Sequence, residues 1–155
     1  MFVYERTGRE ILRTSGMHAV LSANGRFLVE EACPPPGGAN APRTFVLHDL
    51  SSHSERKIPV GSPGLPQAIT DEGQRIVLWE HSPDPRQEAY FIVNEQGKTI
   101  WSKKGPYRLE GVSNKEKRVC FTNTKLRITE FCDLGTGAVL LKMPFAEFKL
   151  LHLNF

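Results

Sequence analysis

The stretch that decides the fold reads Ser22-Ala23-Asn24-Gly25-Arg26-Phe27-Leu28-Val29, a hydroxyl residue and a polar turn followed by a short apolar strand. The pattern returns as Thr70-Asp71-Glu72-Gly73 before Arg75-Ile76-Val77-Leu78, and as Ser113-Asn114-Lys115-Glu116 before Arg118-Val119-Cys120-Phe121. Its step of roughly 45 residues lies in the range of repeat architectures. A repeat of this kind predicts a scaffold and does not specify a chemistry.

A second pattern keeps the same spacing: a β-rich run that ends in a polar corner, followed by a short apolar strand. Its copies occupy residues 2–8, 45–53, 90–97 and 128–137. Together the two patterns predict four short strands in each repeat. We expect strands at His18–Leu21, Arg26–Glu31, Thr44–Leu50, Arg56–Val60, Gln67–Ile69, Arg75–Glu80, Ala89–Asn94, Lys98–Ser102, Leu109–Val112, Arg118–Thr122, Leu126–Asp133 and Ala138–Met143.

The two ends of the chain predict incomplete copies of the same unit. Phe2–Glu5 and Glu10–Arg13 match the third and fourth strands of a repeat, and Phe148–Phe155 matches a first strand. We therefore expect a single repeat domain over residues 1–155. Its units are 1–16 (half a unit), 17–64, 65–106, 107–145 and 146–155 (the first strand of a further unit).

The turns of these units resemble those of β-propeller blades in the broad WD-repeat and quinoprotein-like group. Residues 94–101, Asn-Glu-Gln-Gly-Lys-Thr-Ile-Trp, are most similar to a quinoprotein-type blade, where a Gly-Lys pair and a Trp dock one blade on the next. The resemblance implies an all-β fold, a propeller-like array of four-stranded antiparallel blades. The chain departs from the group because Leu12 and Leu141 stand where the docking Trp101 would be, and because the Gly-His and Trp-Asp pairs of WD repeats are missing.

Ring closure is where the chain departs most from this group. Three complete blades and a remainder are fewer than such propellers commonly contain, and unpaired sheet edges promote aggregation. The leftover strands could close a small four-bladed ring, pair with a second copy in a symmetric dimer, or join the blades of a longer protein. A β-trefoil is the structural alternative, since it also has three repeats of four strands, but it has no place for the extra terminal strands.

Composition places the chain among ordinary globular domains. It has 155 residues, of which 39% are hydrophobic and 24% charged, and a net charge of +3. Lys and Arg alternate with acidic residues instead of forming a stripe, so we do not expect a nucleic-acid partner. The charged N-terminus lacks the apolar core of a signal peptide, and no apolar run is long enough to cross a bilayer. We expect a soluble chain, most consistent with the cytoplasm, and no membrane contact.

No catalytic constellation stands out in the sequence. The five histidines show no metal-ligand spacing, and nucleophile elbows, phosphate loops and dinucleotide fingerprints are absent. Cys33, Cys120 and Cys132 are an odd number without a Cys-x-x-Cys pair, which favours reduced thiols over a disulfide framework or a zinc site. A bridge between Cys120 and Cys132 is the alternative. We predict no catalytic residue, no metal and no cofactor.

The resemblance also predicts where a binding surface would lie. In a propeller, the loops from second to third strand and the links between blades share one face of the disc, and such rims carry function. The longest of these loops here are Cys33–Pro42 and His81–Glu88. We predict a proline-stiffened, mildly basic face, with plain solvated turns as the alternative. Its candidate binding residues are Arg43, Trp79, His81, Arg86, Lys103 and Lys104.

Two classes of function remain open. The favoured hypothesis is a non-catalytic scaffold or interaction module that binds a protein partner through its loop-rich face. It would complete its fold by self-association, as a homo-oligomer such as a dimer, or as part of a longer protein. The alternative is a domain or fragment of a propeller enzyme, such as a quinoprotein-like dehydrogenase or a peptidase- or hydrolase-associated propeller. That alternative requires repeated docking tryptophans and inward carboxylates, whereas Trp101 stands alone.

Overall fold

The chain forms β-strands over most of its length. The computed structural model describes residues 2–4, 10–14, 16–33, 43–61, 64–113, 115 and 117–152. In these residues a two-stranded hairpin precedes three four-stranded sheets, and a short helix follows them. The elements are β1 (Phe2–Tyr4), β2 (Glu10–Arg13), β3 (Met17–Leu21), β4 (Phe27–Glu31), β5 (Thr44–Asp49), β6 (Ser54–Pro59), β7 (Leu65–Ile69), β8 (Arg75–Glu80), β9 (Ala89–Asn94), β10 (Thr99–Lys104), β11 (Tyr107–Ser113), β12 (Arg118–Asn123), β13 (Ile128–Asp133), β14 (Val139–Pro144) and α1 (Phe145–His152).

Each four-stranded sheet is an antiparallel meander, with strand orders β3-β4-β5-β6, β7-β8-β9-β10 and β11-β12-β13-β14. The repeated hydroxyl residue closes the first turn of a sheet. The Ser22 hydroxyl accepts the N–H of Phe27 at 2.9 Å, and the Thr70 hydroxyl accepts the N–H of Arg75 at 3.2 Å. The expected all-β array of four-stranded antiparallel blades is confirmed. The three sheets are called the first, second and third blade below.

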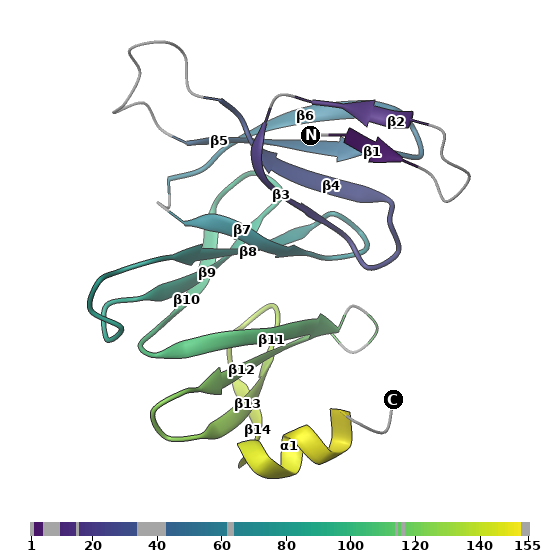
Figure 1. The fold of residues 1–155 in the computed structure, drawn as a ribbon. Coiled ribbons are helices and arrows are strands. Elements are labelled where there is room, and N and C mark those ends of the chain that lie inside the picture. Colours follow the sequence, from purple (N-terminus) through teal and green to yellow (C-terminus); the bar gives the residue numbers. More distant parts are fainter. Residues whose placement is uncertain are drawn as a thin grey trace.

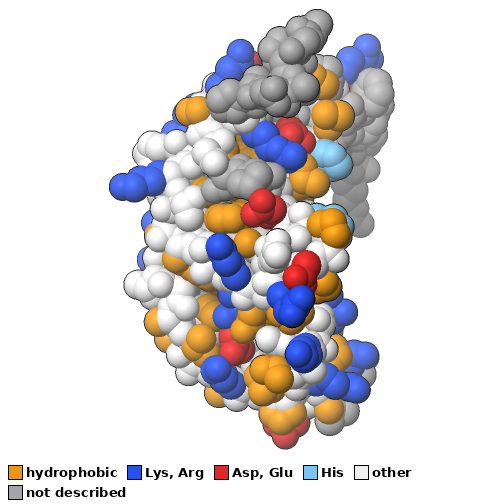
Figure 2. All heavy atoms as spheres, turned by 90° about the vertical axis from the view of Figure 1, so that its left-hand side faces the viewer, with side chains coloured by type: hydrophobic (Ala, Val, Ile, Leu, Met, Phe, Trp, Pro, Cys, Tyr) orange, Lys and Arg blue, Asp and Glu red, His pale blue; other side chains and the backbone are white. Residues whose placement is uncertain are grey.

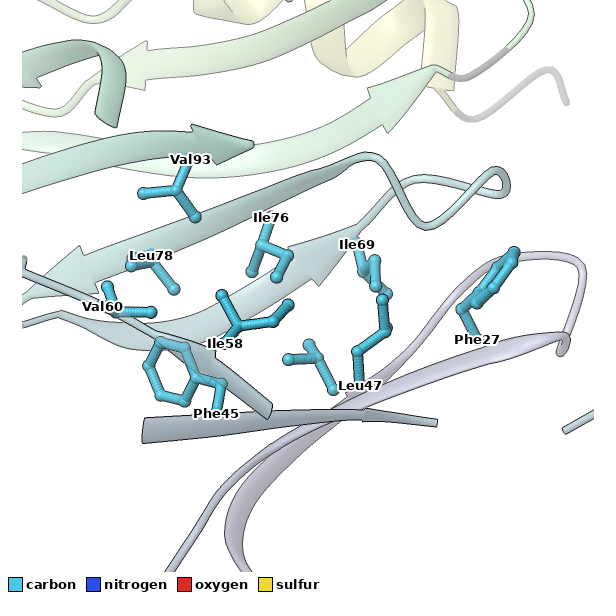
Figure 3. Close-up of a cluster of buried hydrophobic side chains, with 10 residues drawn as sticks. Phe27, Phe45, Leu47, Ile58, Val60, Ile69, Ile76, Leu78 and Val93 are labelled. Carbon is cyan, nitrogen blue, oxygen red and sulfur yellow. The ribbon is translucent and has the colours of Figure 1, made fainter. Parts of the chain in front are cut away.

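The blades stack face to face, and the middle blade is buried on both sides (Figure 1). Because side chains alternate between the faces of a strand, a doubly buried strand must be apolar at consecutive positions. On β8, Ile76 and Leu78 pack on the first blade and Val77 packs on the third. Figure 3 shows Ile76 and Leu78 among side chains of the first blade such as Phe45 and Ile58. Each such side chain contributes about 1.5–3 kcal/mol of stability on burial.

Aromatic rings dominate the junction between the second and third blades. The Phe121 ring on β12 lies 5.0 Å from the ring of Tyr90, and it meets the rings of Trp101 and Tyr107 edge-on at 6.3 and 6.4 Å. The Tyr90 hydroxyl is also bonded, because it accepts the N–H of Leu109 at 3.2 Å. The two junctions therefore share one topology but are filled by different side chains, mainly aliphatic in the first and aromatic in the second.

The turn between the third and fourth strands of a blade is called the corner below, and in the second and third blades it docks on the preceding blade. The corners are residues 50–53, 95–98 and 134–138. A Cβ atom on Gly97 would lie 2.1 Å from the Pro59 carbonyl oxygen, and one on Gly137 would lie 2.7 Å from the Trp101 ring. Trp101 also donates its indole N–H to the Leu134 carbonyl at 3.0 Å. Trp101 thus docks one blade on the next, as the resemblance implies.

The structure corrects the expected last unit. The sequence predicts a first strand within residues 146–155, but Phe145–His152 is helix α1, while residues 153–155 lie outside the described part of the chain. The segment has no β-branched residue, Ala and Lys favour helix, and Glu147 lies in the first turn, where a carboxylate favours the helix dipole. The Phe148 ring then packs on the Phe131 ring at 6.0 Å. None of the described helices is long and apolar enough to cross a membrane.

The β-trefoil alternative is wrong, because the three blades form an open stack with the β1–β2 hairpin and α1 at opposite ends (Figure 1). A bridge between Cys120 and Cys132 is wrong as well. Cys132 packs in the junction with the second blade, whereas Cys120 lines a groove on the other face, and both thiols are free. Burial raises the pKa of the Cys120 thiol to about 12.

We expect Gly97→Ala to destabilise the protein more than Gly25→Ala. Both glycines have positive φ, 80° and 73°, but nothing lies within 4 Å of a Cβ on Gly25. The left-handed backbone costs about 1–2 kcal/mol in either variant, and the clash with Pro59 adds about 1–3 kcal/mol at position 97. Urea denaturation of the two variants measures the difference. Equal losses would show that corner docking adds nothing to stability.

Candidate functional site

The loops between the second and third strands of the blades lie on the side of the stack that Figure 2 presents. Residues 81–88 form this loop in the second blade and residues 124–127 in the third, whereas residues 34–42 of the first lie outside the described residues. Figure 2 shows Lys and Arg side chains spread over this side, with acidic and apolar side chains between them. The face is therefore mixed in charge instead of forming one basic field.

Two of the predicted binding residues, His81 and Arg86, project from the β8–β9 loop. Their side chains are 64% and 83% exposed. His81 Nδ1 lies 3.2 Å from Glu88 Oε1, and Arg86 Nε lies 3.1 Å from Asp84 Oδ1. Hydrogen bonds from the side chain and backbone N–H of Arg86 hold the pKa of the Asp84 carboxyl below its ordinary value. Each basic group thus stands beside an acid of its own loop, which reduces the local field.

Trp79 joins His81 in an aromatic pair beside this loop. The two ring centroids are 5.2 Å apart, with the planes tilted by 53°. The Trp79 indole N–H is buried and has no hydrogen-bond partner among the residues that the structure describes. Such a pair offers a ring surface to a planar or cationic group, which would suit the binding role that the sequence predicts for Trp79.

The structure does not place the remaining predicted residues in that pair. Arg43 precedes β5 on the first blade, where its Nη1 lies 3.3 Å from Glu31 Oε1. Lys104 is exposed at the end of β10. These two side chains belong to different blades, so the six candidates define a broad surface and not one compact site.

Lys103 lies inside the stack instead of on its loop face. Its Nζ is 2.6 Å from Glu130 Oε2 and 4.3 Å from the centroid of the Tyr107 ring, in the junction with the third blade. Lys142 binds the other oxygen of Glu130 at 2.8 Å. Sequence reasoning missed this cluster, although a signal existed: Lys103 follows Trp101 by two residues, so the two side chains share one face of β10.

Glu130 is the buried centre of this cluster. Burial alone would raise the pKa of its carboxyl, but the hydrogen bonds and charges of Lys103 and Lys142 outweigh that effect and set the pKa below its ordinary value of 4.5. The arrangement satisfies both carboxylate oxygens. Because the side chains of Lys103 and Glu130 are largely buried and bonded to each other, we interpret the arrangement as a structural ion cluster that joins β10 to β13.

A second buried acid lies at the other end of the stack. Glu30, 3% exposed, places Oε1 3.1 Å from Nε2 of His48 and also accepts a hydrogen bond from the Thr14 hydroxyl. The neighbouring Glu31 turns to Arg43 instead, so the two adjacent glutamates face opposite sides of β4, as their spacing predicts. Within the described ranges, no three His, Cys, Asp or Glu side chains are grouped so that they could hold a metal ion.

Solved structures with this arrangement are β-propellers. Kuenenia stuttgartiensis hydrazine synthase matches with a TM-score of 0.50 and 12% identity, over 92% of this chain and 55% of that chain. The β-propeller domain of the Trilobed protease from Pyrococcus furiosus has a TM-score of 0.49 and 14% identity, over 83% and 43%. BamB from Moraxella catarrhalis has a TM-score of 0.49 and 15% identity, over 80% and 35%.

The chain thus has the fold of β-propeller blades, and it spans between 35% and 55% of the length of these three chains. At such identities the likeness shows the fold alone. No protein-family model matches the sequence, and no curated protein matches it.

We expect Glu130→Gln to make stability less dependent on pH in acid. Because the folded pKa of Glu130 is depressed, its contribution is present above its ordinary pKa of 4.5 and is lost as the pH falls below that value. The variant should lose about 1–3 kcal/mol at pH 7, where two lysines keep only an amide partner, and it should lose less on acidification. Urea denaturation between about pH 3 and 7 tests this. Glu147→Gln, exposed on α1, is the control, and equal acid sensitivity of all three proteins would contradict the assignment.

Proposed function

We propose that this chain is a non-catalytic interaction module, a segment of a β-propeller that completes its stack by docking a further blade on its third blade. A second copy of the chain or a longer polypeptide supplies that blade. The observation that carries the proposal is an exposed apolar strip on β14, formed by Val139, Leu140 and Leu141. It lies at the position where the preceding blades receive a corner.

The docking position is defined by strand register. The docking position is the residue on the fourth strand of a blade that pairs with the middle of the third strand. The three pairs are Arg56 with Leu47, Trp101 with Ile92, and Leu141 with Phe131. Paired residues of antiparallel strands place their side chains on the same face. In the second blade this is the face that meets the third, since Ile92 and Trp101 belong to that core.

The first two docking positions each receive the opening residue of the next corner. Arg56 Nη2 lies 3.9 Å from Glu95 Oε2, and the Trp101 indole bonds to the carbonyl of Leu134. The charged docking residue Arg56 thus contacts a charged corner residue, and the aromatic docking residue Trp101 contacts an apolar one. The chemistry of the docking residue therefore indicates what kind of corner it accepts.

Leu141 has no corner upon it in the described part of the chain. It is 50% exposed, and its neighbours Val139 and Leu140 are 43% and 53% exposed. Helix α1 covers part of the same face through the contact of Phe148 with Phe131, but it leaves this strip open. Exposed apolar surface on a folded protein is typical of association sites. Leu141 favours an incoming corner that opens with an apolar residue, as Leu134 does.

The loop-rich face is the second surface of the proposed module. His81, Arg86 and Lys104 are exposed there, and the Trp79–His81 rings provide an apolar contact beside them. Aromatic and arginine side chains are those that most often dominate protein interfaces. We infer that a partner protein with acidic side chains binds here, where its carboxylates would compete with Asp84 for Arg86.

We expect the purified chain to form a dimer whose stability depends on Leu141. Light scattering after size exclusion should give about twice 17.4 kDa for the native chain and the monomer mass for Leu141→Glu, because a buried charge opposes docking. Leu126→Glu is the matched control, since Leu126 is 64% exposed on the β12–β13 turn, away from the strip. A native monomer at every concentration would contradict self-association, and dimers in both variants would contradict the role of Leu141.

A further inference from the structure

The first junction between blades is closed at the rim opposite the loop-rich face. The Phe27 ring packs against the next blade, where a Cβ on Gly73 would lie 2.9 Å from a ring carbon. Beside it, the Asn24 backbone N–H donates to Asp71 Oδ1 at 2.8 Å, and the Asn24 amide donates to the Asp71 carbonyl at 3.2 Å. An aromatic ring and two hydrogen bonds thus fill this part of the junction.

At the second junction an arginine takes the place of that ring. Phe27 and Arg75 are equivalent, since each is the first residue of its strand and each N–H bonds to the hydroxyl five residues earlier, in Ser22 or Thr70. Where the ring would lie there is a cavity of about 350 Å³ between the second and third blades. Its walls include Thr70, Glu72, Gln74, Arg75, Lys117 and Leu134. Figure 1 places the β7–β8 turn, which carries Thr70, Glu72 and Gln74, on the side of the stack away from the β8–β9 loop.

Two positive charges border the cavity without an ion pair among the described residues. The guanidinium of Arg75 donates to the Gln74 carbonyl at 2.9 Å, and it has no other hydrogen-bond partner in the described part of the chain. Its cross-strand neighbour is Asn94, whereas the equivalent residues Phe27 and Arg118 face Asp49 and Asp133. The second blade therefore has an amide at the position where the other two blades have a carboxylate.

The acids near the cavity do not neutralise these charges at close range. Glu72 lines the cavity but lies within ion-pair distance of no described cation. Asp133 acts on Lys117 through its charge, yet its Oδ1 already accepts the N–H groups of Gly135 and Thr136 at 3.0 and 2.7 Å. Arg75, which is half-buried, and Lys117, which is exposed, thus line one cavity from opposing blades.

We propose that this rim cavity binds a small ligand carrying an oxyanion, a carboxylate or a phosphate, between Arg75 and Lys117. The planar guanidinium suits two parallel hydrogen bonds to such a group, and the ammonium adds a point charge. The Thr70 hydroxyl oxygen accepts two backbone N–H groups, which leaves its own O–H to donate. Leu134 provides an apolar wall, and the volume is that of a small-molecule site.

This site is independent of the proposed docking of a further blade. It lies between two blades of one chain, and its residues are neither on the β14 strip nor on the loop-rich face. A monomer that binds oxyanions would overturn the self-association proposal alone. A dimer that does not bind them would overturn the cavity proposal alone.

Calorimetric titration of the whole chain with citrate and with pyrophosphate, in low salt, tests the proposal. The native chain should bind at least one of the two, and Arg75→Gln and Lys117→Gln should each weaken that binding at least about tenfold, the loss expected for a charge-assisted hydrogen bond. Preference for citrate would indicate a carboxylate ligand, and preference for pyrophosphate a phosphate. Lys117 is exposed, so its variant keeps the test valid if Arg75→Gln folds poorly.

Two further variants separate a built site from general attraction of anions. Arg75→Phe restores the ring that Phe27 provides at the first junction, so it should abolish binding while keeping the native urea midpoint. Arg86→Gln removes the same charge from the loop-rich face and should leave the dissociation constant unchanged. Equal weakening by Arg75→Gln and Arg86→Gln would overturn the proposal, as would a native chain that binds neither probe at about 10 mM.

Discussion

The fold depends on the burial of the second blade between two others. A strand in that position has no solvent-facing side, so polar alternation is excluded and runs such as Ile76-Val77-Leu78 must be continuously apolar. The two cores that meet this blade are made of side chains from different blades, so each blade depends on a neighbour for part of its core. The corners add to the same constraint, because Gly97 and Gly137 lie so close to the preceding blade that a side chain would displace it.

The outer faces of the first and third blades are covered in different ways. Beyond the first blade, Glu30 and His48 make a buried polar pair that Thr14 of the preceding segment helps to satisfy. Beyond the third blade, α1 covers Phe131 with Phe148, much as the third blade covers Tyr90 with Phe121. The helix is thus a partial substitute for a blade. Because it spans eight residues, it covers the centre of the face and leaves the strip around Leu141 uncovered.

Local features of the sequence were sufficient to predict most of the fold. Strands and their turns follow from short patterns such as Thr70 to Leu78, whose hydroxyl, glycine and apolar run each act within a few residues. The predictions that were wrong concern residues whose packing partners are distant in sequence. Residues 145–152 are apolar enough for a strand, and only their propensity and packing on Phe131 make them a helix. Lys103 was placed on the surface because its partner, Glu130, belongs to another blade.

Departures from the repeat are the most informative positions in this chain. Equivalent residues of stacked blades have the same backbone geometry. The fold therefore does not explain why one of them differs in residue type, and the cause must lie in the surroundings of that residue. Arg75 in the place of Phe27 replaces an aromatic filling by a charge beside a cavity, and Asn94 in the place of Asp49 leaves an uncharged residue opposite Arg75. Together they leave the charge of Arg75 without an acid as its cross-strand neighbour. Poor packing alone would require neither a charged residue at position 75 nor an uncharged one at position 94. An anion-binding cavity therefore explains the second junction better than a poorly packed version of the first.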